Sequence, residues 1–173
     1  GGFGGGAIVF PGRQNGSQDM RLFFSRRIGL SDAGQAIPIL GGTRLSGRQG
    51  RYSVGLLNIQ QREDSGVPAT NFTAIRVKRD VLANSEIGAV LLNKDEAGPR
   101  FNRMAGFDSS FRFGFLSLGG FVARTVSPAG FGPQTGNEIA SRANFNYQDR
   151  KWQFRGRFDT VGARFNDELG FIP

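Results

Sequence analysis

The stretch Trp152-Gln153-Phe154-Arg155-Gly156-Arg157-Phe158-Asp159 decides the fold class of this chain. Successive side chains of a β-strand point to opposite faces of the sheet. In that conformation the aromatic residues of the stretch lie on one face, and its arginines and aspartate lie on the other. The run Phe107-Asp108-Ser109-Ser110-Phe111-Arg112-Phe113 repeats the alternation. Both stretches therefore predict strands that separate an apolar surface from a charged one.

The composition of the chain also favours strands. Its 173 residues are enough for one domain with a hydrophobic core, or for part of something larger. Its 27 glycines are spread along the chain, which favours turns and bulges over helices. No apolar run is long enough for a membrane helix. The formal net charge of +8 fits nucleic acid, anionic lipid or acidic glycans, and does not choose among them.

The absence of cysteine and histidine limits the chemistry that the chain can perform alone. Zinc sites, cysteine proteases and Ser-His-Asp hydrolases are excluded as self-contained functions. Adjacent carboxylates occur at Glu63-Asp64, Asp95-Glu96 and Asp167-Glu168. Neighbours in a strand point to opposite faces, and neighbours in a loop are usually solvated, so none of these pairs forms a facing acid/base pair by itself. We therefore expect a protein that is not an enzyme and that holds no cofactor or metal.

Turn signals divide the chain into segments of about ten residues. Residues 1–17 are expected to be a glycine-rich lead-in or linker, and residues 18–173 a β-barrel meander from a longer protein. Tight turns alternate with longer loops rich in glycine and proline. The sequence thus predicts an all-β fold, an antiparallel up-and-down meander of roughly eight or nine strands that forms a β-barrel. The segments that carry the strands are Met20–Arg27, Ile37–Arg48, Tyr52–Leu56, Phe72–Asp80, Ile87–Leu91, Phe101–Gly114, Phe115–Val126, Glu138–Tyr147 and Trp152–Val161.

Two settings fit such a meander, and strand alternation alone leaves both open. In a soluble sandwich or barrel the apolar face looks inward, whereas in an outer-membrane barrel it meets lipid and charged residues line the interior. Strands of about ten residues and the alternation of short with long connections favour the membrane. So does the mixture of charge signs on one face, because opposite charges can pair across strands within a lumen.

Several motifs in order along the chain carry a family resemblance. The first is Leu22-Phe23-Phe24-Ser25-Arg26-Arg27-Ile28-Gly29-Leu30, and a second surrounds Arg44 in Pro38-Ile39-Leu40-Gly41-Gly42-Thr43-Arg44-Leu45-Ser46-Gly47-Arg48. The last is Phe165-Asn166-Asp167-Glu168-Leu169-Gly170-Phe171. Together they resemble the DUF5916 family, bacterial proteins that contain a carbohydrate-binding family 9 domain. The resemblance implies that this chain is the front part of the family's C-terminal outer-membrane β-barrel region, and it brings no catalytic residues with it.

The resemblance and the strand pattern together predict the role of each face. The motif positions that we single out are Phe24, Ser25, Arg26, Arg27, Ile28, Gly29, Arg44, Asn166 and Gly170. The candidate lipid-facing residues are Phe107, Phe111, Phe113, Trp152, Phe154 and Phe158. The candidate residues of the barrel interior are Arg76, Lys78, Asp80, Asp108, Arg112, Arg155, Arg157 and Asp159.

Function and partners follow from these assignments as expectations. The chain is expected in the bacterial outer membrane or cell envelope, serving solute passage or surface glycan handling. Its expected partners are outer-membrane lipid, a glycan or small solute, and the remainder of the full-length protein or another copy. The alternative is a soluble β-sandwich or barrel that binds acidic glycans, with Ser25-Arg26-Arg27 as one candidate anion site. Nucleic acid is not expected, since a stacking platform needs aromatic residues and arginines on the same face.

Overall fold

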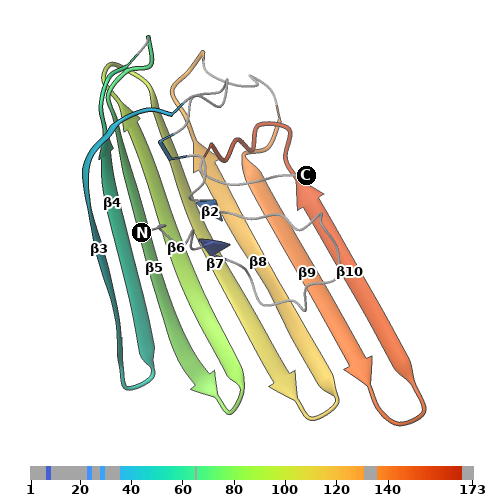
Figure 1. Cartoon of the computed structure of the whole chain (residues 1–173). Coiled ribbons are helices and arrows are strands. Elements are labelled where there is room, and N and C mark those ends of the chain that lie inside the picture. The colour runs from blue at the N-terminus through green and yellow to red at the C-terminus, as the bar shows by residue number, and fades with distance from the viewer. Residues whose placement is uncertain are drawn as a thin grey trace.

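The computed structural model describes residues 7–8, 23–24, 28–29, 36–64, 66–130 and 136–168. Within them, eight long strands form one antiparallel sheet in the order β10-β9-β8-β7-β6-β5-β4-β3 (Figure 1). A separate two-stranded sheet pairs β1 (Ala7–Ile8) with β2 (Phe23–Phe24). The long strands are β3 (Ile39–Gln49), β4 (Tyr52–Gln61), β5 (Thr70–Leu82), β6 (Ser85–Glu96), β7 (Phe101–Phe113), β8 (Leu116–Val126), β9 (Ile139–Gln148) and β10 (Gln153–Val161).

The connections give the sheet two different ends. Two-residue turns join β3 to β4 and β7 to β8, and each begins with a glycine in the left-handed region, Gly50 (φ 58°) and Gly114 (φ 54°). Asn84 (φ 60°) serves the β5–β6 turn, because asparagine tolerates this region better than other side chains. All tight turns lie together at the bottom of Figure 1, and the longer connections lie at the top. We call these the turn end and the loop end of the sheet.

Every strand of the large sheet pairs with its neighbours in the sequence, so the predicted all-β antiparallel meander is confirmed. In the described part of the chain this sheet is open, with β3 and β10 as its edge strands. The predicted closure into a barrel is therefore not observed there. Of the predicted strand Met20–Arg27, only Phe23–Phe24 is seen, as β2, and the other residues of that segment lie outside the described residues. The predicted glycine-rich lead-in contains β1.

The strands β4, β5 and β6 are longer than the sequence predicted, and β4 continues from the predicted end at Leu56 to Gln61. Thr70 and Asn71 precede the predicted strand Phe72–Asp80 but begin β5, and β6 continues past the predicted end at Leu91 through Asp95 and Glu96. These four residues pair with one another across the two strands. These residues are polar, so they lack the apolar alternation by which a strand is predicted. At this end of the sheet, hydrogen bonds and ion pairs of the side chains take the place of apolar packing.

The hydrophobic core lies on one face of the sheet, at the loop end. It consists of side chains from β5 to β9 and of one residue that follows β10, Phe165, which is 7% exposed. The strand side chains of this core alternate along β5, β6 and β8, as expected for one face of a sheet. Its members are Phe72, Ala74, Val90, Leu92, Met104, Phe121, Ala123, Ala140 and Phe165.

Candidate functional site

The face opposite the core exposes large apolar side chains over most of its area, and we call it the apolar face. Phe107 is 49% exposed and Phe158 is 67% exposed, although both lie well inside their strands. The cross-strand register places thirteen large exposed hydrophobic side chains on this face. They are Leu45, Tyr52, Val54, Leu91, Phe107, Phe113, Leu118, Val122, Val126, Ile139, Phe145, Phe154 and Phe158.

The apolar face ends in a row of polar side chains at the loop end, which we call the polar row. The amide of Asn58 donates to Asn71 at 3.0 Å and to the Thr73 hydroxyl at 2.9 Å. Two strands further on, Arg103 Nε donates to the Asn93 side chain at 3.0 Å. The register aligns Asn58, Thr73, Asn93 and Arg103 in one row across four strands. This row marks where the exposed surface changes from apolar to polar.

Aromatic side chains gather on the same face at the turn end. Trp152 stacks on Phe154 with 6.0 Å between ring centroids, and Tyr147 lies 6.3 Å from Phe154. Phe111 and Phe113 stack at 6.1 Å on β7. The apolar face is thus a band between an aromatic rim and a polar row.

The turn between β9 and β10 holds one side of this rim in place. Asp149 Oδ1 accepts hydrogen bonds from the backbone N–H of Trp152 at 2.6 Å and of Lys151 at 2.7 Å. Tyr147 donates its hydroxyl to the other carboxylate oxygen at 3.0 Å. The N–H groups of Trp152 and then of Lys151 favour the ionised form, so they hold the pKa of Asp149 below its usual value of 3.8.

This lowered pKa predicts a pH dependence for the turn. A carboxyl group whose pKa is lower in the folded state adds stability above its unfolded pKa, and that stability is lost as the pH falls through the folded pKa. We expect the thermal unfolding midpoint of the wild type to fall as the pH drops below 3.8. Asp149→Asn keeps an oxygen acceptor and does not titrate, so its midpoint should lose less on acidification. An identical acid response in the two proteins would contradict this assignment.

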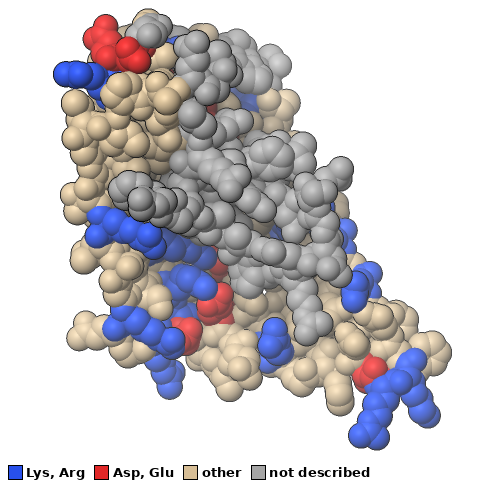
Figure 2. Space-filling model, in the orientation of Figure 1, with Lys and Arg blue, Asp and Glu red and all other residues tan. Residues whose placement is uncertain are grey.

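The face that carries the core is charged from its middle to the turn end, and we call it the mixed face. Figure 2 shows basic and acidic side chains side by side on the lower part of the face turned to the viewer. Lys78 pairs with Glu86 at 2.6 Å and Arg48 with Asp80 at 2.6 Å. Eight basic and four acidic side chains lie in this half: Arg44, Arg48, Arg76, Lys78, Arg112, Arg142, Arg155 and Arg157, with Asp80, Glu86, Asp108 and Asp159.

The most buried ion pair of this half joins β5 to β7 across the strand between them. Arg76 donates from both Nη atoms to the two carboxylate oxygens of Asp108, and its Nη2 lies 2.8 Å from Oδ1. The two side chains are 11% and 1% exposed. A Cβ at Gly88 of β6 would lie 2.7 Å from Nη2 of Arg76, so the guanidinium crosses β6 where that strand has no side chain. A side chain at position 88 would therefore displace the Arg76 guanidinium from this position.

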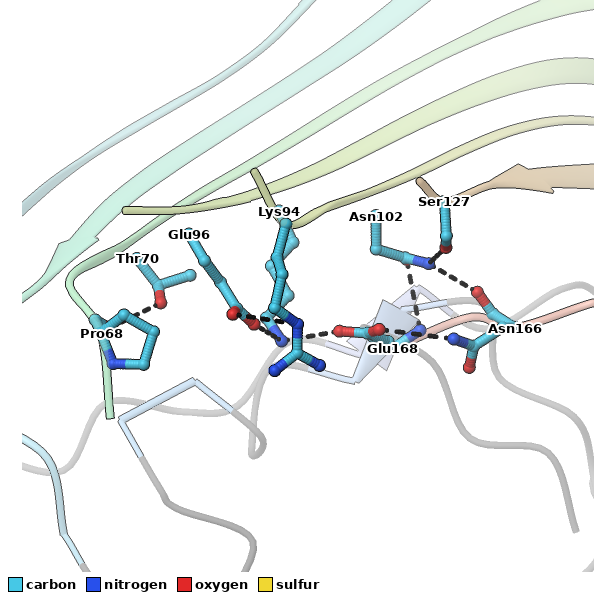
Figure 3. A network of polar contacts seen from close by, with 9 residues as sticks. Pro68, Thr70, Lys94, Glu96, Asn102, Ser127, Asn166 and Glu168 are labelled. Carbon is cyan, nitrogen blue, oxygen red and sulfur yellow. Dashed lines mark hydrogen bonds and ion pairs between the residues drawn. The ribbon is translucent and has the colours of Figure 1, made fainter. Parts of the chain in front are cut away.

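The segment after β10 folds back over the loop end of the mixed face (Figure 3). Asn102 donates to the backbone carbonyl of Asn166 at 2.8 Å and accepts from the backbone N–H of Glu168 at 3.4 Å. Lys94 of β6 lies 2.6 Å from Glu168 and 2.8 Å from Glu96. Phe165 enters the core beside these contacts. Residues 162–168, which we call the docking segment, are therefore fixed both by apolar packing and by buried polar groups.

Asn102 is the central polar contact of the docking segment, and removing it should loosen the segment. The side chain is only 2% exposed, so Asn102→Ala leaves buried backbone groups of the segment without their partner. We expect a loss of about 1–3 kcal/mol in the free energy of unfolding and faster proteolysis at residues 162–168. Asn93→Ala is the matched control, because Asn93 bonds to Arg103 and Asp95 on the apolar face. Equal proteolysis of the two variants would contradict the role given to Asn102.

The structure places the predicted site residues on the two faces as follows. The eight candidate interior residues are all on the mixed face, although Asp80 of β5 and Arg155 of β10 lie five strands apart. Five candidate lipid-facing residues are on the apolar face, and Trp152 lies in the turn just before β10. Whether these faces meet a lumen and lipid stays a prediction.

The motif residues are only partly described. Ile28 packs against the core, and the backbone N–H of Gly29 donates to the Gln61 side chain at 3.2 Å. Arg44 lies on the mixed face of β3, and Asn166 belongs to the docking segment. Phe24 lies in β2, whose side chains are outside the described residues. Ser25, Arg26, Arg27 and Gly170 lie outside the described residues altogether.

Sequence reasoning missed the polar residues that receive the docking segment. Asn102 and Thr125 occupy core-facing positions of β7 and β8 and are each 2% exposed. The alternation gave no signal for Asn102, because Asn102 shares the predicted charged face of its strand with Asp108 and Arg112. Glu96 belongs to the sequence pair Asp95-Glu96, and Glu168 belongs to the pair Asp167-Glu168. Lys94 binds both glutamates and so brings these two carboxylates together.

Comparisons with known proteins add no assignment. A scan against protein-family models matched none, and neither curated proteins nor solved structures gave a match. Among the described residues, no helix is long and apolar enough to cross a membrane. The same residues contain no group of three or more His, Cys, Asp or Glu side chains that could hold a metal ion. The class of this protein is thus set by its fold, an antiparallel β-meander with one apolar and one mixed face.

Proposed function

We propose that this chain forms part of the wall of an outer-membrane β-barrel in a bacterial envelope and is not a catalyst. The apolar face lies against lipid, and the mixed face lies toward the barrel interior, where a solute passes or is handled. The observation that carries the proposal is the apolar face itself. A soluble monomer rarely leaves so many large apolar side chains exposed on one face in water, and lipid gives that face a favourable environment.

The dimensions of the apolar face support the same setting. On β7 the residues of this face from Ala105 to Phe113 carry no charge. Eight residue steps correspond to about 26 Å of strand, close to the roughly 25 Å apolar band of outer-membrane barrels. Such barrels have aromatic girdles at the membrane interfaces, and the aromatic rim at the turn end matches one girdle. Short turns at one end and longer loops at the other follow the same plan.

The open edges of the sheet indicate that each edge strand of the barrel wall needs a further strand beside it. Backbone groups along β3 and β10 have no further strand beside them in the described residues. Such edges are very unfavourable in lipid, because no water can satisfy the N–H and C=O groups there. In a meander of eight strands the first and last run antiparallel, so these edges can pair with each other or with added strands. Where the edges do not pair with each other, the added strands come from the remainder of the full-length protein or from another copy.

Liposome flotation tests the proposal directly. The purified chain, refolded from denaturant in the presence of lipid vesicles, should float with them through a density gradient and stay bound in high salt and at alkaline pH. Electrostatic adsorption of a chain with a net charge of +8 would be removed by salt, so the salt wash is the necessary control. A chain that stays soluble and monomeric without lipid or detergent would contradict the proposal and favour the soluble acidic-glycan module.

A further inference from the structure

One row of side chains on the mixed face combines two arginines with two neutral polar residues. Arg112 of β7 pairs with Ser117 of β8, Ser117 pairs with Asn146 of β9, and Asn146 pairs with Arg155 of β10. All four therefore lie in one line across four strands. The Cα atoms of the two arginines are about 14 Å apart, which is three strand spacings. Both arginine side chains are exposed.

The two arginines differ from most basic residues around them in having no carboxylate partner. Arg48, Arg76, Lys78, Arg142 and Arg157 each pair with an Asp or Glu on the same face. Within the described residues, Arg112 and Arg155 form no ion pair. Arg155 donates from Nε to the Asn146 side chain at 3.2 Å, and its Nη2 lies 2.6 Å from the Gln153 side chain, whose amide oxygen accepts from it. The Nη donors of Arg112 and Nη1 of Arg155 remain for a ligand, and guanidinium N–H groups suit a carboxylate.

The surface between the two arginines is built from small and neutral polar residues. The next row toward the loop end contains Ser110, Gly119 and Asn144, followed by Arg157. The Asn144 amide lies over Gly119, since a Cβ there would be 3.2 Å from Asn144 Oδ1. Hydroxyl and amide groups of this kind donate to and accept from the hydroxyl groups of a sugar.

We propose that the row Arg112–Ser117–Asn146–Arg155 binds an acidic saccharide of about two sugar residues. The arginines hold the carboxylates, and Ser117 and Asn146 bond to the ring hydroxyls between them. This inference rests on the proposed function only for the direction in which the row faces, which is the barrel interior. The inference names the chemical class of the solute in that interior, which is a carboxylate that also carries hydroxyl groups.

Binding of digalacturonate to the detergent-refolded chain tests this site. Isothermal titration at moderate salt should show binding, and Arg112→Gln and Arg155→Gln should each weaken it at least tenfold, because each removes a charge-assisted contact. Arg48→Gln is the matched control: it removes one positive charge from the same face, near the far edge of the sheet, and should change the affinity less than threefold. Arg112→Lys keeps the charge without the two-pronged geometry and should bind with intermediate affinity.

The competing results are separable. Neutral maltose should not bind, and inorganic sulfate should bind at least tenfold more weakly than digalacturonate, since it uses only the charges. Equal weakening by Arg48→Gln, or equal affinity for sulfate, would overturn the proposal in favour of diffuse charge attraction. Loss of binding with unchanged far-UV circular dichroism identifies a contact and not misfolding. A chain that floats with lipid but does not bind digalacturonate refutes this site alone, whereas one that binds but does not float refutes the membrane setting alone.

Discussion

Asp108→Ala should lower the free energy of unfolding by about 3–5 kcal/mol, among the largest effects that we expect from a single substitution in this chain. Removing the carboxylate leaves the Arg76 guanidinium, whose side chain is only 11% exposed, beside β6 without the carboxylate that both of its Nη atoms bind. The loss of stability comes chiefly from the buried positive charge that is left behind, because an intact buried ion pair adds little net stability. Urea unfolding of the detergent-refolded protein, followed by far-UV circular dichroism, measures the loss.

Two further variants make this prediction specific. Asp80→Ala breaks the pair with Arg48, whose side chains are 67% and 43% exposed, and should cost only about 0–1 kcal/mol. Replacing both buried partners, as Arg76→Met with Asp108→Leu, should recover most of the stability lost in Asp108→Ala. If the double variant is as unstable as the single one, burial of the Arg76 charge without the Asp108 carboxylate is not the cause.

Phe107→Lys should destabilise the chain in lipid by about 2–4 kcal/mol, since it places a charge near the middle of the apolar band. Phe107 lies at the centre of β7, and Phe113 lies at its turn end within the aromatic rim. Phe113→Lys should therefore cost only about 0–1 kcal/mol, as charges near a membrane interface do. If the apolar face met water, both substitutions would be ordinary surface changes within about 0.5 kcal/mol. Unfolding titrations in vesicles of the two variants distinguish these cases.

Much of the fold could be predicted because alternation along single strands is a local property. The alternation predicts which side chains share a face in the stretches 152–159 and 107–113. The observed register puts these side chains on the predicted faces. The tight turns were readable from Asn84, Gly114 and their neighbours, since few residues adopt left-handed backbone angles easily. Local chemistry of this kind is sufficient for strand order in a meander, where each strand pairs with the next one.

The contacts between distant parts of the chain could not be predicted in the same way. Arg76 and Asp108 were assigned to one face, but their pairing across Gly88 depends on the register of three strands together. The docking segment was recognised only as a motif, and its placement over β6 and β7 arises from Phe165 and Asn102. Such contacts require knowledge of which segments meet in space, and strand periodicity does not contain it.

The most direct test of the account uses the single tryptophan of the chain, Trp152. In a Trp152→Phe background, tryptophan is introduced at Phe154 or at Arg155, neighbours on β10 that lie at the same height and point to opposite faces. Vesicles of lipid brominated near the interfacial end of the acyl chain quench tryptophan on contact. We predict strong quenching for the Phe154→Trp protein and little for the Arg155→Trp protein. Equal quenching of the two, or stronger quenching at position 155, would contradict the claim that the apolar face meets lipid.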